Sequence, residues 1–266
     1  TRRGADAQRI AFENLRVALP GGTLSEPFNL GLSWNGAGRE LKARAIRLGE
    51  WQALLPSLPV EDALRVRLQH LQPRGRLDSL MLGWAGAAPG PDNFRIEARF
   101  RGLGLDAVEG QPGFANLSGY IEGDARGGRF ELDSRALVLD LPTLFREPRI
   151  GLDNLQARGT WERTQRGRLM HLEHAAFAND DAAGKASGRY ELIAGTPGVI
   201  DLEARLTRAN GTAVHRYLPK IVGDHTVEWV KRAIVAGISS DVRLTLKGDL
   251  RGFPFDSGEG IFRVDA

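Results

Sequence analysis

The sequence contains no cysteine, and lysine is scarce. The missing cysteine excludes a disulfide scaffold, a thiolate zinc site and a cysteine nucleophile. Only 5 of the 36 basic residues are lysine, so arginine supplies almost all of the positive charge. The 33 acidic residues reduce the net charge to +3, and the two signs alternate along the whole chain. A nucleic-acid-binding protein would more often carry a concentrated basic patch, so we do not expect nucleic acid as a partner.

Long hydrophobic runs are also missing. No stretch approaches eighteen consecutive apolar residues, and the N-terminus has no secretory signal pattern. With 42% hydrophobic and 26% charged residues, the chain can nevertheless bury a core and fold. It begins at Thr1 without methionine and ends just after a strand-like alternation at 261–264. We therefore expect it to be a segment of a longer protein.

Motifs that carry catalysis or bind cofactors are absent from the sequence. There is no G-x-S-x-G elbow and no P-loop, and the glycines of 102–107 lack the helix that a dinucleotide site requires. His171 and His174 are three residues apart, which suits two metal ligands on a helix. Their segment has the pattern of a strand, where positions three apart point to opposite faces. We predict no catalytic residue, no metal site, no cofactor and no enzymatic activity.

The dominant pattern is an alternation of apolar and polar residues with a period of two. It predicts strands with one apolar and one solvated face, as in antiparallel sheets. Gly-rich turns such as 20–22, 127–128 and 195–198 separate these segments, and the 33 Gly and 13 Pro fit a long meander. The alternation covers the following segments: 15–19, 28–34, 95–101, 129–133, 137–141, 200–207 and 242–247.

Four segments break this alternation and favour helix. They are 49–55, 60–71, 212–218 and 224–236, although alternation at Leu64, Val66 and Leu68 leaves a strand open for the second. In the last segment, Asp224 can cap the N-terminus and Gly237 can end the helix. We therefore expect a repeating β segment over 1–211 with a helical insertion near 49–71, a second helical insertion over 212–237, and a return to the sheet over 238–266.

A long sheet of this kind has a continuous apolar face that needs a cover. A second sheet would cover it in a sandwich, closure would cover it in a barrel, and a ligand would cover it in an open groove. The alternation alone leaves all three open.

Three motifs near the C-terminus resemble the YhdP branch of the AsmA-like proteins. They are Arg216-Tyr217-Leu218-Pro219, the helix around Trp229 to Ala233, and the run from Gly248 to Phe255, which ends in Phe-Pro-Phe. The earlier stretch 71–77, which leads into 80–84, is similar to a strand entry of the same branch. His215 departs from the pattern, because an aromatic residue is expected there.

This resemblance implies a Gram-negative envelope protein that is anchored in the inner membrane and lies in the periplasm. Its fold would be mainly β: a long antiparallel meander, curled into an elongated groove with an apolar interior, plus a few short helices. Such proteins are similar to bridge-like lipid transfer proteins, so the expected partners are phospholipid acyl chains, the rest of the longer chain, and the inner and outer membranes. The expected function is phospholipid transport that supports the outer-membrane permeability barrier. A structural or interaction domain without a lipid conduit is the alternative.

The apolar members of the alternating segments are the expected lining of this groove. Ordinary core packing is the competing interpretation for each of them. The predicted lining residues are Phe100, Phe130, Leu132, Leu137, Leu139, Ile200, Leu202, Leu206, Val242, Leu244 and Leu246.

Overall fold

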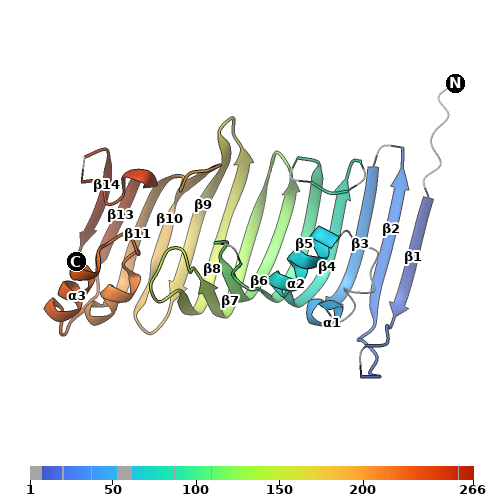
Figure 1. The fold of residues 1–266 in the computed structure, drawn as a ribbon, viewed down its shortest axis with the longest axis horizontal. Coiled ribbons are helices and arrows are strands. Elements are labelled where there is room, and N and C mark those ends of the chain that lie inside the picture. The colour runs from blue at the N-terminus through green and yellow to red at the C-terminus, as the bar shows by residue number, and fades with distance from the viewer. Residues whose placement is uncertain are drawn as a thin grey trace.

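The computed structural model contains one open antiparallel sheet of fourteen strands (Figure 1). It describes residues 8–19, 21–36, 38–52, 62–86, 88–90, 92–108, 110–256 and 258–266. Thirteen strands follow one another in sequence order, and β12 pairs with β11 beside this path. The strands are β1 (Gln8–Leu15), β2 (Phe28–Asn35), β3 (Gly38–Arg47), β4 (Arg74–Trp84), β5 (Phe94–Leu105), β6 (Gly113–Asp124), β7 (Gly127–Asp140), β8 (Arg149–Arg163), β9 (Gly167–Ala178), β10 (Ala182–Ile193), β11 (Val199–Asn210), β12 (Ile238–Ser239), β13 (Val242–Asp249) and β14 (Gly260–Asp265).

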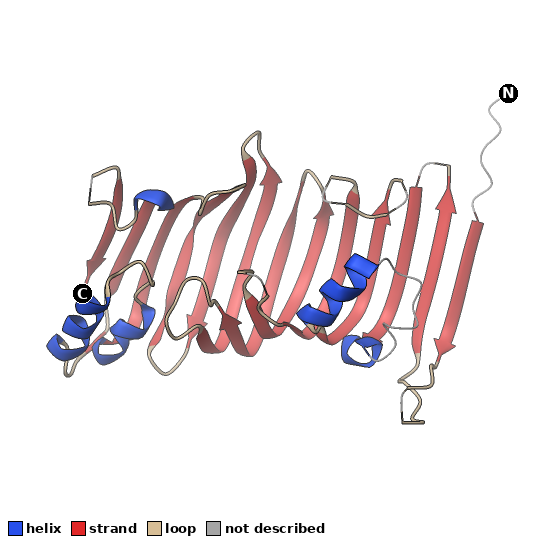
Figure 2. Cartoon of the chain, viewed as in Figure 1, coloured by secondary structure: helices blue, strands red, loops and turns tan. Residues whose placement is uncertain are grey.

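The helices gather mainly along one edge of the curled sheet, as Figure 2 shows. We call this edge the lower lip; it holds the connections from β1 to β2, β3 to β4, β5 to β6, β7 to β8, β9 to β10 and β11 to β13. The opposite edge, the upper lip, has shorter hairpin connections and one short helical turn. The lower lip carries α1 (Leu48–Gln52), α2 (Asp62–Leu71), η2 (Gly211–Tyr217) and α3 (Asp224–Ala233), and the upper lip carries η3 (Leu250–Gly252).

The buried core is small for a chain of this length. Its main cluster lies at the lower lip, where Trp51 of α1 meets Phe28 edge-on with ring centroids 5.3 Å apart. The accessible surface is 16946 Å², whereas a compact protein of 29.0 kDa would expose about 11,400 Å². In the described part of the chain, the sheet therefore has no second layer over most of its apolar face. The prediction of a mainly β, elongated and curled antiparallel meander is confirmed.

Bulges in three neighbouring strands bend the sheet near the lower lip. The register shifts in β5, β6 and β7, and both Asn116 and Ala136 have positive φ angles, of 64° and 49°. Such bulges leave backbone groups unpaired and increase local twist. Serine hydroxyls satisfy them here: Ser118 Oγ accepts from Gly102 N at 3.0 Å, and Ser134 Oγ accepts from Ser118 N at 2.9 Å. Sequence alternation alone does not predict these shifts.

The helical insertion after β11 differs in detail from the sequence prediction. The first helix is a 3-10 helix, and α3 ends at Ala233 instead of continuing to residue 236. Gly223 occupies the N-cap position predicted for Asp224, whose carboxylate instead accepts two hydrogen bonds from Arg146, at 3.0 and 2.7 Å. For the segment 60–71, where the sequence leaves a strand open, α2 shows a helix over Asp62–Leu71. The predicted helical residues 53–55, 60 and 61 lie outside the described residues.

The prediction that His171 and His174 point to opposite faces of the sheet is wrong. A bulge in β9 shifts the register between them, so that His171 pairs with Thr160 and His174 pairs with Arg158. Both partners lie on the polar face, and both histidines therefore point to that face. The described residues contain no group of three or more potential metal-ligating side chains.

Candidate functional site: an apolar trough

Cross-strand pairing aligns apolar side chains into continuous rows. Directly opposed residues of antiparallel strands point to the same face, so a row can be followed from strand to strand. The middle row crosses all thirteen strands of the path without a polar side chain. Its members are Phe12, Leu30, Ala43, Leu80, Ala98, Ile121, Phe130, Gly159, Leu172, Gly188, Leu202, Leu246 and Phe262.

Two further rows flank the middle row on the same face. The upper row is also complete and differs from the middle row mainly in its larger aromatic members. It consists of Ile10, Leu32, Leu41, Leu82, Ile96, Gly123, Gly128, Trp161, Met170, Tyr190, Ile200, Gly248 and Gly260. The lower row consists of Ile46, Leu77, Phe100, Gly119, Leu132, Ala157, Ala175, Ala186, Ala204, Leu244 and Val264.

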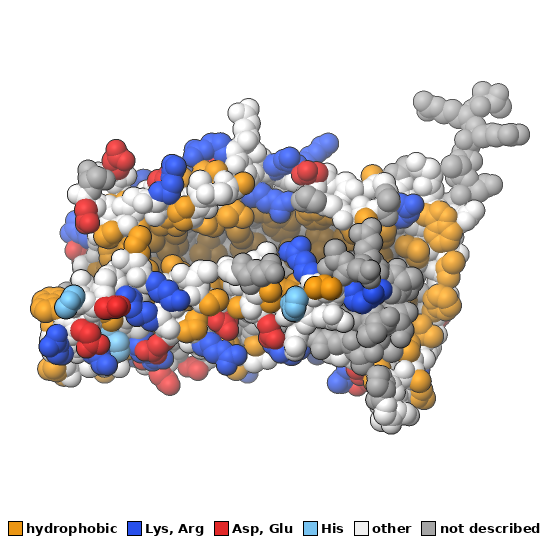
Figure 3. Space-filling view, viewed as in Figure 1, with side chains coloured by type: hydrophobic (Ala, Val, Ile, Leu, Met, Phe, Trp, Pro, Cys, Tyr) orange, Lys and Arg blue, Asp and Glu red, His pale blue; other side chains and the backbone are white. Residues whose placement is uncertain are grey.

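These three rows form the inner surface of the curled sheet, which we call the apolar trough. Figure 3 shows a long hollow lined by hydrophobic side chains and edged by charged ones. Leu48 and Trp51 of α1 pack on this face, against Ala43 and Ile46. At about 4.8 Å per strand, the thirteen strands give the trough a length of about 58 Å.

The predicted lining residues occupy two different environments. Six are half-buried members of the three rows, and Leu139 and Leu206 are half-buried outside these rows. Phe100, Leu137 and Val242 are instead 8%, 0% and 4% exposed, so they serve as packing below the surface. The half-buried residues are Phe130, Leu132, Leu139, Ile200, Leu202, Leu206, Leu244 and Leu246. Whether these eight residues contact lipid remains a prediction.

Several members of the rows were missed by sequence reasoning. Trp161, Met170 and Tyr190 form one stretch of the upper row, and Leu172 follows in the middle row. Their strands contain the same period of two, so the alternation could have found Trp161 and Tyr190. The bulge in β9 changes the phase of the alternation and hides the continuation from Leu172 to Ala175.

Glycines beside large side chains keep the trough surface even. A Cβ atom at Gly128 would lie 2.2 Å from Cζ2 of Trp161, and one at Gly159 would lie 2.8 Å from Cζ of Phe130. Each aromatic ring therefore lies over a glycine of a neighbouring strand. This arrangement accommodates large rings on the crowded inner side of a curved sheet.

The outer face of the sheet carries the charged residues in cross-strand pairs. Arg129 pairs with Glu122 at 2.7 Å, and Asp201 receives both Lys247 at 3.2 Å and Arg189 at 3.3 Å. The hydrogen bond from Lys247 is the main cause that lowers the pKa of Asp201. Exposed pairs of this kind stabilise a fold little. Their position nevertheless fixes the register, because a shift by one residue would move these charges into the trough.

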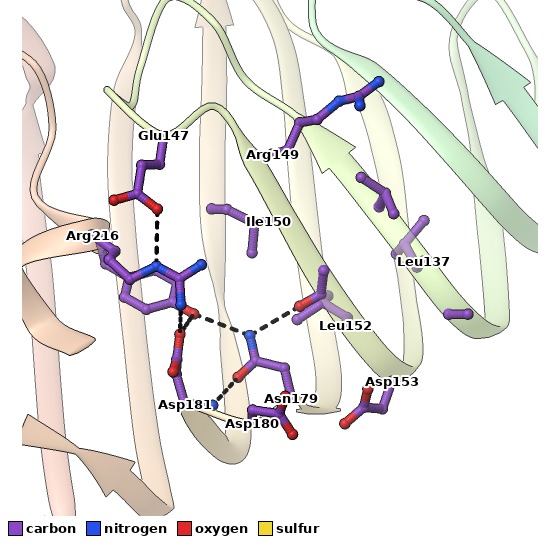
Figure 4. Close-up of a pocket in the computed structure, with 14 residues that line it drawn as sticks. Leu137, Glu147, Arg149, Ile150, Leu152, Asp153, Asn179, Asp180, Asp181 and Arg216 are labelled. Carbon is purple, nitrogen blue, oxygen red and sulfur yellow. Dashed lines mark hydrogen bonds and ion pairs between the residues drawn. The ribbon is translucent and has the colours of Figure 1, made fainter. Parts of the chain in front are cut away.

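A polar pocket of about 340 Å³ lies at the lower lip (Figure 4). Arg216 of η2 donates to Glu147 at 3.0 Å and to Asp181 at 2.7 Å. The hydroxyl of Tyr217 donates to Asp181 at 2.8 Å and accepts from Asn179 at 3.0 Å. Burial, followed by the hydrogen bond to Asp181, raises the pKa of Tyr217. This network joins the insertion to the β7–β8 loop and the β9–β10 turn, so we assign it a structural role.

The largely open apolar trough and the uncrossed order of strands define a β-groove protein. A family model described as YhdP protein matches residues 1–266, and the chain belongs to this family of bacterial envelope proteins, which is not a known enzyme family. No curated protein and no solved structure matches the chain. Among the described residues, no helix is long and apolar enough to span a membrane.

Proposed function

We propose that this chain carries phospholipids along its trough between the inner and outer membranes. The observation that supports this most directly is the middle row, which crosses thirteen strands without a polar side chain and is at least partly exposed at ten of its thirteen positions. An apolar surface of this length needs a partner. Acyl chains suit it because they are long and unbranched and require no directional contacts.

The chemistry of the lining fits transport better than selective storage. Burial of each CH2 group contributes about 0.8 kcal/mol, whatever its position along the surface. Leucine, isoleucine, alanine and glycine repeat along the rows, so a tail meets similar surroundings at each strand. Movement from strand to strand then changes the binding free energy little, and the tail is not trapped at one point.

The proposed location is the periplasm, within a longer chain anchored in the inner membrane. Membership of a bacterial envelope family supports this setting. The remainder of that chain is the proposed neighbour at the two edges of the sheet, where β1 and β14 each pair with a single described strand. In this setting, the transport would support the permeability barrier of the outer membrane.

Lipid binding by the purified chain tests the proposal. Mass spectrometry of the extracted protein should find phospholipid in the wild type. Leu202→Glu places a charge in the middle row of β11 and should reduce the bound lipid by about fivefold or more, because a buried carboxylate is costly. Thr207→Glu adds the same charge at an exposed position of the same strand and should leave lipid binding unchanged.

A structural domain without a lipid conduit is the second candidate. The observation in its favour is α3, which has no buried residue and leaves Trp229 66% exposed, as a helix that docks a partner would. This candidate predicts lipid-free wild-type protein, and it predicts that Leu202→Glu lowers the free energy of unfolding. Retained folding together with lost lipid would contradict it.

A further inference from the structure

The rows of the inner face differ in charge between the two lips. Beyond the upper row, pairing aligns one more set of inward-facing residues at the upper lip, which we call the rim row. It consists of Gln8, Trp34, Arg39, Trp84 and Phe94 on β1 to β5, and of Arg163, Arg168 and Leu192 on β8 to β10. In the three trough rows and the rim row together, the only charged side chains are these three arginines. Within these four rows the inner face is therefore cationic at the upper lip and apolar below it, whereas Glu147 and Asp181 of the lower-lip pocket are paired with Arg216.

Among the three arginines of the rim row, Arg39 is the one without an interaction partner in the described part of the chain. It lies directly opposite Trp34 on one side and Trp84 on the other. Its side chain is exposed and has no hydrogen bond or ion pair to any described residue. By contrast, Arg163 forms an ion pair with Asp92, and Arg168 also has an interaction partner.

A second donor lies on the residue directly opposite Arg39, in a pocket that Glu40 and Asp124 also line. Nε1 of Trp84 is buried and has no hydrogen-bond partner in the described part of the chain. A guanidinium flanked by indole rings, immediately above an apolar surface, suits an anion that is attached to a hydrophobic body. Guanidinium groups bind phosphate oxygens through paired, charge-assisted hydrogen bonds. Indole rings favour the boundary between apolar and aqueous surroundings.

We propose that Arg39 binds the phosphate of phospholipid headgroups, so that bound lipids lie with their headgroups at the upper lip and their tails toward the lower lip. This inference rests on the proposed function, and it adds an orientation to it. The tails would cross the upper, middle and lower rows in turn. The headgroup would remain in water at the upper lip, away from the helices of the lower lip.

A comparison of two lipids with the same acyl chains distinguishes the contribution of the headgroup to binding from that of the tails. Binding of a phosphatidylethanolamine and of the corresponding diacylglycerol, each with a fluorophore on one acyl chain, is measured for the wild type and for Arg39→Gln. We expect the substitution to weaken phosphatidylethanolamine binding about tenfold and to leave diacylglycerol binding unchanged. Arg44→Gln is the matched control, because Arg44 is an exposed arginine of the same strand on the outer face, opposite Ser79. It should change neither affinity.

The possible outcomes separate the two proposals. If the wild type binds both lipids and Arg39→Gln weakens neither, or weakens both equally, the headgroup role of Arg39 is overturned and the trough proposal stands. If the wild type binds neither lipid, both proposals fail. Glycerol 3-phosphate, which has the phosphate without the tails, should not compete at millimolar concentration. Competition that depends on Arg39 would assign the site to free phosphate and overturn the lipid orientation.

Discussion

At the scale of single residues, the trough depends on where side chains are missing as much as on where they are present. Gly159 lies in the middle row beneath the ring of Phe130, and its Cβ position would also lie 2.2 Å from the carbonyl oxygen of His171. Backbone atoms cannot move aside as the end of a flexible side chain can. The glycine is therefore required by the close approach of β8, β7 and β9.

The substitution Gly159→Ala should lower the free energy of unfolding by about 1–3 kcal/mol, as overpacking in closely packed regions does. Urea denaturation of the purified chain measures this change. Gly151→Ala is the matched control in the same strand, because no atom lies within 4 Å of its Cβ position. Its effect should stay within about 0.5 kcal/mol. Equal effects of the two substitutions would contradict the role assigned to the close contact.

At the scale of elements, alternation predicted strands such as β2, β5, β7, β11 and β13, but it did not predict where the phase changes within a strand. Phe130 and Leu132 have even numbers and Leu137 and Leu139 odd ones, so a strict period of two would place the two pairs on opposite faces. The bulge at Ala136 brings both pairs to the inner face. That shift depends on hydrogen bonds with Ser118 and Asn116 of the neighbouring strand. Such long-range contacts leave no local pattern in the sequence.

The trough itself could be predicted only in part, because it too depends on contacts between residues far apart in the sequence. The apolar members of the alternation were visible, but their burial depends on what lies above them. Leu137 is fully buried whereas Leu139, two residues later, is half-exposed. The cationic rim row could not be predicted either, because it combines Arg39 with Arg163 and Arg168 from strands far apart in the sequence.

The helical insertion of residues 211–237 is held to the sheet mainly by polar contacts. Arg146 donates to Asp224 and to the carbonyl oxygens of Pro219 and Val222, the last at 2.6 Å. Phe145 forms a β-bridge with Pro219. No residue of α3 is buried, so the loss of Arg146 should release this insertion without unfolding the sheet.

Arg146→Ala should therefore accelerate tryptic cleavage after Lys220, while global stability changes by about 1 kcal/mol or less. Limited proteolysis followed by mass spectrometry measures the first effect, and urea denaturation measures the second. Arg149→Ala is the control, because Arg149 is 77% exposed and lies 3.6 Å from Asp140. An unchanged rate of cleavage after Lys220 would show that other contacts hold the insertion.

At the scale of the whole molecule, the sheet is open at both ends. β1 leaves Ile10 and Phe12 about half-exposed, and β14 does the same with Ile261 and Val264. Edge strands with apolar side chains readily pair with other strands. Contact between the β1 edge of one copy and the β14 edge of the next would be heterologous, so it would not close on itself.

The purified chain should accordingly associate as its concentration rises, and Ile261→Lys should reduce this association by placing a charge on the edge strand. Light scattering over a concentration series measures the effect. Val66→Lys is the control: Val66 is 49% exposed, close to the 48% of Ile261, but lies on α2 away from the edges. If both variants associate as the wild type does, the edges are not the contact.

Because the strands pair in sequence order, the sheet can be lengthened or shortened by whole hairpins. Each strand pairs with its neighbours in sequence, so one hairpin can be removed or duplicated without reversing the direction of any later strand. Each such step would change the span of the sheet by about 9.6 Å. The reach of a sheet of this design can thus be set by the number of hairpins alone, while the chemistry of every remaining strand stays the same.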